Sequence, residues 1–400
     1  MAHGTVVTEI KNPGPHQISG KSRTILMVLA AIGVLTFAGG LAFDAKRTWS
    51  GFLVNHFYFM SLALGGLFFA AIQWITGAMW SSPIRRIAES FTSYLPVALV
   101  MFIILYFGMH SLFPWTHPEI VKGDIILEGK AGYLNVPFFM IRNIVAIGLW
   151  IFFTKKLVGN SIAQDISRDP QLTIKNKQLT PAFLLIFGLT YTMASFDLLM
   201  SLDPHWFSTM FGVYTFSGLF YSTLALTAVL AAVLKKDGRL DGIVNPNHMH
   251  DLGKFMFAFA IFWAYIGFSQ FMLIWYSNLP EETQYFLHRF QNGWFYVSVF
   301  LLVGKFMVPF FALIPRGSKR DDKRLFIVGV FMLIAQWVDI FWLVQPEAFR
   351  EGPVIGWIEI GLTLGFIGMF GLMVARFLGR NSIVAIGDPL LKEAVFHHHQ

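Results

Sequence analysis

The sequence predicts an all-α integral membrane protein with ten transmembrane helices. Of its 400 residues, 55% are hydrophobic and only 13% are charged, whereas about 25% are charged in ordinary soluble domains. Apolar segments of roughly 20 residues, the length that crosses a hydrocarbon core of about 30 Å, recur along the chain. Backbone amides in lipid must bond within their own segment, so segments of this length indicate helices.

The ten predicted spans divide the chain into three parts: a cytoplasmic N-terminal segment (1–23), a membrane domain (24–377) and a cytoplasmic C-terminal tail (378–400). We expect two four-helix bundles with two peripheral helices. The spans fall near residues 24–43, 52–79, 94–113, 136–154, 181–200, 211–234, 253–277, 291–314, 324–345 and 354–377.

The distribution of basic residues predicts the orientation. Most of the 30 Lys and Arg residues lie in the terminal segments and in the loops after spans two, four, six and eight. By the positive-inside rule, both termini are cytoplasmic. The net charge of +7 is therefore loop charge and does not indicate nucleic-acid binding. Within these loops, residues 80–89 predict a short interfacial segment and residues 155–180 a connection between spans.

The chain has no cysteine, which excludes a thiolate-bound iron–sulfur cluster and covalent c-type haem within it. A b-type haem needs paired histidines on facing helices, and only His56 and His110 share a comparable depth, too close to the outer surface for two haems across the membrane. The 248–251 stretch, with two histidines and an aspartate, indicates a helix start more than a metal site. The triplet 397–399 indicates a flexible tail, so we expect no metal site.

Ionisable residues inside spans are the strongest functional signal, because each costs on the order of 3 kcal/mol near the bilayer centre. Opposite signs at similar depth favour a proton relay or a ligand site in an outer polar chamber, although for any single residue a purely structural ion pair is equally favoured. The expected chamber residues are His56, Arg142, Asp197, Asp203, His205, Asp339 and Glu359. Lys305 is expected in the inner half of the membrane, on a separate proton path that crosses only that half.

Helical spacing predicts polar lanes along two spans. Gln291, Ser298 and Lys305 recur every seven residues, which places them on one helix face. Gln336 and Asp339 share a face in the same way.

The stretch 195–208, SFDLLMSLDPHWFS, places two carboxylates and a histidine between two apolar spans. Asp203 followed by Pro204 predicts an N-cap and first helical position. Asp197 has no such local role. His205 adds a group that titrates near neutral pH, a composition expected where protons leave toward the outside.

The tenth span carries Gly361, Gly365, Gly368 and Gly371 on nearly one surface. Such a surface allows close helix approach. We favour packing inside this chain over contact with another subunit.

The run from residue 195 to 214, SFDLLMSLDPHWFSTMFGVY, together with ten spans and no cysteine, resembles the NrfD/polysulfide-reductase family of membrane anchors. Within that family the likeness is to the second such subunit of the bacterial alternative complex III. The resemblance implies a multi-pass protein of the bacterial inner membrane that holds no redox metal. It also implies a quinol:electron-acceptor oxidoreductase around it, with quinol as a possible substrate.

The partners implied by the resemblance are a homologous ten-helix sister subunit, an iron–sulfur subunit and multihaem c-type cytochrome subunits. The sister subunit is the better candidate for the quinol site. The expected role of this protein in the complex is then proton transfer or structural pairing with the other subunits.

Two other functions remain open. A secondary transporter would also use buried charges and glycine-rich spans. Its helices often break near the midplane, whereas the prolines here fall near span ends. A purely structural membrane anchor predicts that the buried charges pair directly with one another.

Overall fold

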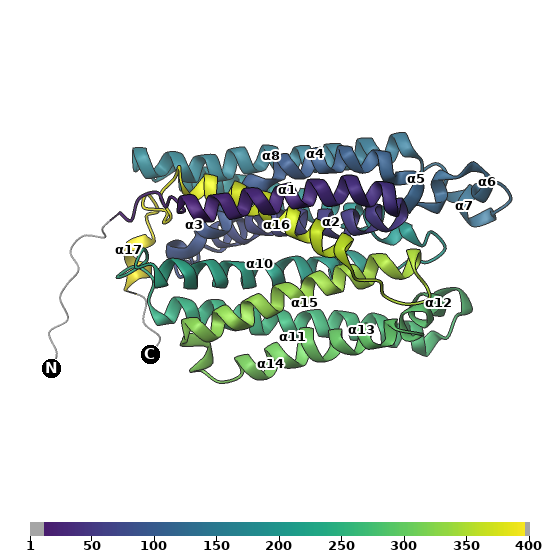
Figure 1. The fold of residues 1–400 in the computed structure, drawn as a ribbon. Helices are drawn as coiled ribbons and strands as arrows, with labels where there is room; N and C mark the ends of the chain where they lie inside the picture. Colours follow the sequence, from purple (N-terminus) through teal and green to yellow (C-terminus); the bar gives the residue numbers. More distant parts are fainter. Residues whose placement is uncertain (1–11, 397–400) are drawn as a thin grey trace.

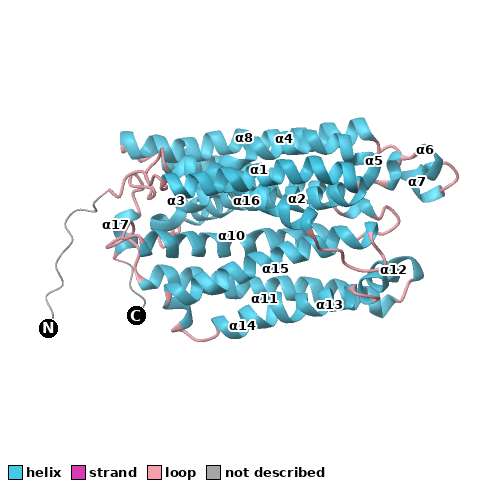
Figure 2. Ribbon diagram, viewed as in Figure 1, coloured by secondary structure: helices cyan, strands magenta, loops and turns pink. Residues whose placement is uncertain are grey.

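The computed structural model describes residues 12–396, and these residues form an elongated bundle of helices (Figure 1). Figure 2 shows helices joined by short loops, and no β-strand occurs among the described residues. Within residues 12–396, ten helical segments are long and apolar enough to cross a membrane. The predicted all-α, ten-span fold is therefore confirmed at this level.

Seven spans consist of one long helix each. They are α1 (Gly20–Phe43), α2 (Ala45–Thr76), α8 (Val136–Ser167), α10 (Phe211–Lys236), α11 (Pro246–Ser277), α15 (Asp322–Ala348) and α16 (Trp357–Leu378).

Three spans are composite. The third joins α3 (Ser82–Phe91), η1 (Thr92–Tyr94), α4 (Leu95–Leu105), η2 (Tyr106–Gly108) and α5 (Met109–Leu112). The fifth joins α9 (Gln171–Leu198) and η4 (Met200–Leu202), and the eighth joins α13 (Trp294–Phe300), the π-helical η5 (Leu301–Met307) and α14 (Val308–Leu313).

The remaining short elements lie outside the spans. They are η3 (Pro114–Thr116), α6 (Pro118–Val121), α7 (Ile125–Lys130), α12 (Pro280–Phe290), η6 (Ser318–Arg320) and α17 (Leu391–Val395). In Figure 1, α6, α7 and α12 lie at the end of the bundle opposite to α17.

Two expectations about the loops are wrong. Residues 82–91 form α3, whose residues are all buried, and this helix continues directly into the third membrane-length segment instead of forming a separate short segment. Most of the 155–180 connection is also helical, since α8 runs to Ser167 and α9 begins at Gln171. Sequence hydropathy missed both extensions because each contains charged residues; in α3 these are paired inside the protein, whereas Lys155, Lys156, Lys175 and Lys177 of α8 and α9 are exposed.

The centre of the bundle is formed by α2 and α10, which pack against each other and against α9 and α15. Most residues of both helices are buried. Glycine permits the closest approach: a Cβ atom at Gly65 would overlap the side chain of Thr223 on α10. Small residues thus bring the two central helices together without a polar interaction.

The glycine surface of the tenth span packs inside this chain, as expected. Gly365 of α16 and Gly33 of α1 meet so closely that a Cβ atom on either would overlap the backbone of the other. Gly368 approaches the Ala30 amide nitrogen in the same way, because an added Cβ would lie 2.5 Å from it. The α1 helix is therefore held mainly by α16.

The two chain ends meet at one end of the bundle. The Ile383 amide donates to the Gly14 carbonyl at 3.1 Å, and the His16 amide donates to the Leu378 carbonyl at 2.8 Å. The C-terminal segment is thus docked through residue 396. The 248–251 stretch begins α11 as expected, with Asn245 as N-cap and the His248 Nδ1 accepting from the Asn245 amide. Residues 397–399 lie outside the described residues.

Candidate functional site

The ionisable residues predicted inside spans are buried, and five of the six charged or imidazole groups concerned have direct ionic partners. Three separate pairs account for them: Arg142 with Asp197, Lys305 with Asp339, and Arg47 with Glu359. The exception is His56. Burial of paired charges is the arrangement expected in a medium of low dielectric constant.

Asp197 receives three hydrogen bonds from α8. Arg142 donates from Nε to Oδ2 at 3.1 Å and from Nη2 to Oδ1 at 2.9 Å, and Asn143 donates from Nδ2 to Oδ2 at 2.9 Å. The guanidinium also lies 3.7 Å from the ring centroid of Tyr133 and donates to the Tyr133 carbonyl. A bidentate, stacked arginine fixes α8 against α9 in one register. Asp197 therefore has a structural role that its sequence position did not reveal.

Lys305 and Asp339 form a completely buried pair between η5 and α15. The Lys305 Nζ donates to Asp339 Oδ2 at 2.6 Å, and the Tyr214 hydroxyl donates to Asp339 Oδ1 at 2.5 Å. The ammonium also lies 4.0 Å from the ring centroid of Trp263. Ammonium, carboxylate and phenol thus form one continuous hydrogen-bonded chain that can exchange a proton among three groups.

The expected assignment of Lys305 to a half-path of its own is wrong, because it bonds directly to Asp339. The π-helical turn accounts for part of this geometry. Residues Leu301–Met307 form η5, and the Tyr221 hydroxyl donates to the Lys305 carbonyl at 3.0 Å. A π-helix shifts the register of the side chains that follow it, and such turns are frequent at functional sites.

The seven-residue polar lane on this span is also wrong. Gln291 is exposed and precedes α13, which starts only at Trp294. Ser298 instead accepts from the Trp342 indole and donates to the Arg289 carbonyl. A chain bend before α13 and the π-helical turn within the span break the helical spacing on which the lane depended.

Glu359 lies in the first turn of α16 and binds the start of α2, just after the turn that follows α1. Arg47 donates to both of its carboxylate oxygens at 2.6 Å, and the Gly356 amide donates to Oε2 at 2.7 Å. Arg47 is placed by Asp44, the single residue between α1 and α2, whose side chain accepts from the Arg47 amide. Arg47 was not among the predicted site residues, because it lies at a helix start, outside the predicted span.

His56 of α2 is fully buried, and neither ring nitrogen has a hydrogen-bond partner among the described residues. Its ring lies between those of Phe52 and Phe102, with centroid distances of 6.4 and 6.2 Å. The structure does not join His56 to any of the three ion pairs.

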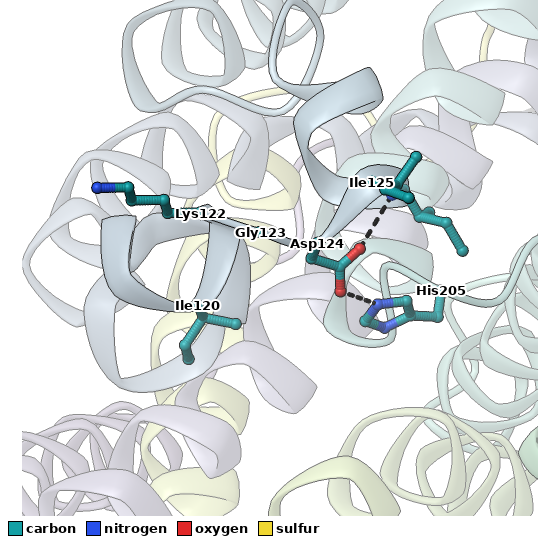
Figure 3. A pocket seen from close by; sticks show the side chains of 7 residues that line it. Ile120, Lys122, Gly123, Asp124, Ile125 and His205 are labelled. Carbon is teal, nitrogen blue, oxygen red and sulfur yellow. Dashed lines mark hydrogen bonds and ion pairs between the residues drawn. The ribbon is translucent and has the colours of Figure 1, made fainter.

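The 203–208 loop is held by the segment that contains α7. The His205 side chain faces that of Asp124 (Figure 3), with Nε2 and Oδ2 2.6 Å apart, and the Lys130 Nζ donates to the Pro204 carbonyl at 2.6 Å. Asp124 is also the N-cap of α7, because its other oxygen accepts from the Ile126 and Leu127 amides. His205 therefore pairs with Asp124, which the sequence analysis missed, and is half exposed.

Asp203 does not N-cap a helix, so that expectation is wrong; it instead follows the last residue of η4, and its amide donates to the Met200 carbonyl at 3.2 Å. Its side chain accepts only from the His205 amide, in a turn after η4, and α10 begins eight residues later at Phe211. Burial raises the pKa of Asp203, and the nearby Glu347 carboxylate raises it further. The pKa of Asp124 is lowered by hydrogen bonds from the α7 backbone and from His205. The pKa values of these two loop carboxylates are thus shifted in opposite directions.

The expected single chamber is replaced by separate pairs. No hydrogen bond or ion pair within residues 12–396 links Arg142–Asp197, Lys305–Asp339 and Arg47–Glu359 to one another. Each pair joins two different helices and is not bonded to either of the other pairs. The predicted depth of a residue does not specify which helices are neighbours.

Two further buried charge clusters lie outside the predicted spans. Arg289 of α12 stacks on Tyr285, 3.4 Å from its ring centroid, and bonds to Glu347 at 3.0 Å. At the other end, two arginines of α3 meet three carboxylates from α3, α8 and the C-terminal segment. This second cluster contains Arg85, Arg86, Glu89, Asp165 and Asp388. Two arginines beside Glu89 in one short helix were the only available sequence signal.

Among the residues that the structure describes, no group of three or more His, Asp or Glu side chains is arranged to hold a metal ion. A scan against protein-family models finds no match for the chain, and a search of curated proteins finds no similar sequence.

Proposed function

We propose that this protein is a membrane subunit of a respiratory quinol:electron-acceptor oxidoreductase of the alternative complex III type, similar to the subunit called ActF. In this proposal both termini are cytoplasmic, and the ten spans form two four-helix bundles with two peripheral helices in the bacterial inner membrane. The partners are a ten-helix sister subunit, an iron–sulfur subunit and multihaem cytochromes. Quinol is oxidised in the complex, and haem c and the iron–sulfur clusters belong to the partners.

The observation that carries a role in proton transfer is the buried chain Tyr214–Asp339–Lys305. Its three polar groups are joined by hydrogen bonds of 2.5 and 2.6 Å, and all three residues are buried. Intramembrane ionisable groups of this kind commonly mark proton or ion pathways. We assign to these three hydrogen-bonded side chains the transient uptake and release of a proton that accompanies quinol oxidation.

Substitution of Tyr214 by Phe tests this role, because it removes one hydroxyl and leaves the Lys305–Asp339 pair in place. We expect a several-fold loss of proton release per electron in membrane vesicles supplied with quinol. Tyr191→Phe is the matched control: Tyr191 is equally buried, but its hydroxyl contacts Ser61 and Thr215 and no carboxylate. Equal proton release by the two variants would refute the assignment.

Isolation from native membranes tests the complex itself. We expect the protein to purify together with iron–sulfur and multihaem cytochrome polypeptides, detected by haem absorbance and by mass spectrometry of the bands. Purification of the chain alone under conditions that preserve other respiratory complexes would contradict the redox proposal.

A structural anchor is the second candidate, and a specific observation favours it. The Arg142–Asp197 and Arg47–Glu359 pairs are bonded directly, at 2.6–3.1 Å. Direct pairing is what an anchor without a relay predicts. We therefore assign these two pairs to stability and only the Lys305 chain to proton transfer. A transporter needs accessible charges, so direct pairing supports it less.

A further inference from the structure

A groove of about 580 Å³ runs along the side of α13 and α15 near the end of the bundle that carries α12. Its walls are formed by Tyr296, Val297 and Phe300 of α13 and by Val338 of α15. Its volume lies within the range of about 300–1,000 Å³ that is typical of small-molecule sites. Val338 directly precedes Asp339, so the inner end of the groove reaches the level of the buried ion pair.

The end of the groove near the loop is built from fixed backbone. Gly293 lies against Pro353, since an added Cβ would be 2.7 Å from the proline Cδ. Gly352 has φ +151°, which disfavours a side chain there. The Asn292 side chain donates to the Arg350 carbonyl at 3.2 Å, and the Trp294 indole donates to the Phe349 carbonyl at 2.8 Å. Two glycines thus leave a hollow that hydrogen bonds keep open.

The position of the groove determines the chemistry of its occupant. Its walls are apolar and belong to two segments that are long and apolar enough to span a membrane. Tyr296 is 75% exposed at its edge, as is common for aromatic residues at the membrane–water interface. A hollow on this surface is in contact with lipid, so an acyl chain is the ligand that matches its walls.

The polar end of the groove discriminates among headgroups. Glu351 lines the groove, and Arg350, the preceding residue in sequence, is exposed but does not itself line the groove. A carboxylate in the groove, with a guanidinium one residue away along the chain, matches the amine and the phosphate of a zwitterionic headgroup. A primary ammonium donates hydrogen bonds to a carboxylate, whereas a quaternary choline has no N–H group to donate.

We propose that this groove binds one phospholipid that has a primary-amine, zwitterionic headgroup, with an acyl chain along α13 and the amine at Glu351. The site is independent of the proposed redox function, because none of its contacts involves Lys305, Asp339 or Tyr214.

The test uses the full-length protein in nanodiscs that contain equal amounts of phosphatidylethanolamine and phosphatidylcholine. Lipid retained after transfer to detergent is quantified by native mass spectrometry. We expect the wild-type protein to retain phosphatidylethanolamine several-fold over phosphatidylcholine. We expect Glu351→Gln to abolish this preference while the total number of retained lipids stays unchanged.

Val297→Trp fills the groove and should lower the number of retained lipids by one. Val299→Trp is the matched control, because Val299 is exposed on the same helix and does not line the groove. Equal retention of the two lipids by the wild-type protein would overturn the headgroup assignment. Equal retention by the two tryptophan variants would overturn the groove as the site. Because Glu351 is exposed, its substitution by Gln should not disturb folding. The headgroup test with Glu351→Gln can therefore be made even if Val297→Trp does not fold.

Discussion

At the scale of single residues, the buried charges of this protein serve two different purposes. Arg142 is bidentate and stacked, and its three nitrogens donate to both Asp197 oxygens and to the Tyr133 carbonyl. Lys305 has a single carboxylate partner, and that partner is shared with a phenol. A guanidinium is effectively always protonated, whereas an ammonium can release its proton when it is buried. The residue type therefore separates a structural pair from one that can exchange protons.

The Lys305–Asp339 pair gives a prediction about stability. Lys305→Met and Asp339→Asn each leave one uncompensated buried group, so we expect each to lower the free energy of unfolding by about 3–5 kcal/mol. The measurement is unfolding of the purified protein in mixed detergent. The double variant Lys305→Met/Asp339→Leu removes both charges and should recover most of the loss. A double variant that is less stable than either single one would show that the pair itself is net stabilising.

At the scale of elements, close helix contact in this protein depends on glycine. The α1 helix packs against α16 where Gly33 meets Gly365, and its other faces are largely exposed within the described chain. Helices in lipid gain little from the hydrophobic effect, so their association depends on close van der Waals contact. The length of α1 therefore contributes less to its docking than the absence of side chains at this crossing.

Substitution of Gly365 by Leu should detach α1 from the bundle, because the new side chain occupies the space of the Gly33 backbone. We expect faster proteolytic cleavage near residue 44, the joint between α1 and α2, and a lower thermal midpoint. Gly148→Leu serves as the control: Gly148 is an exposed mid-helix glycine of α8 with no atom within 4 Å of an added Cβ. Equal effects of the two substitutions would show that lost backbone flexibility, and not the crossing, is responsible.

At the scale of the whole molecule, the two chain ends close one end of the bundle. The segment after α16 bonds to residues before α1, to α8 and to the start of α11. Its strongest anchor is the ion pair between Arg85 and Asp388 at 2.5 Å, in which both side chains are buried. The C-terminal segment thus connects helices that are distant in sequence.

The docking of this segment should depend on pH. Burial alone would raise the pKa of Asp388, but Arg85 and the Leu390 amide outweigh it, and the pKa is lowered. A lowered pKa means that the stabilisation is complete above the unfolded value of about 3.9 and is lost as pH falls through the folded value. We expect amide hydrogen exchange in residues 380–396 to increase as pH falls below about 4, after correction for intrinsic rates. Asp388→Asn should show the increased exchange already at neutral pH; normal protection in that variant would contradict the anchor.

Some features of this protein can be predicted from its sequence, and others cannot. Ten spans follow from apolar length, because lipid imposes that length on every helix that crosses it. The unusual residues of the interior follow as well, since a charged group in an apolar segment has a cost that demands a partner. The partners do not follow: Arg47, Tyr214 and Asp124 lie outside the residues that hydropathy marks as anomalous.

The sequence by itself determined that this protein is a bundle of ten membrane-length helices with charges inside it. Tertiary structure decided which charges meet: Lys305 joined Asp339 across η5 and α15, and Asp203 came to follow the end of η4 instead of capping the start of a helix. The physical reason is that hydropathy and helical period are local properties of the chain. Pairing depends on which helices are neighbours and on one π-helical turn that shifts the register, and both are properties of the packed bundle.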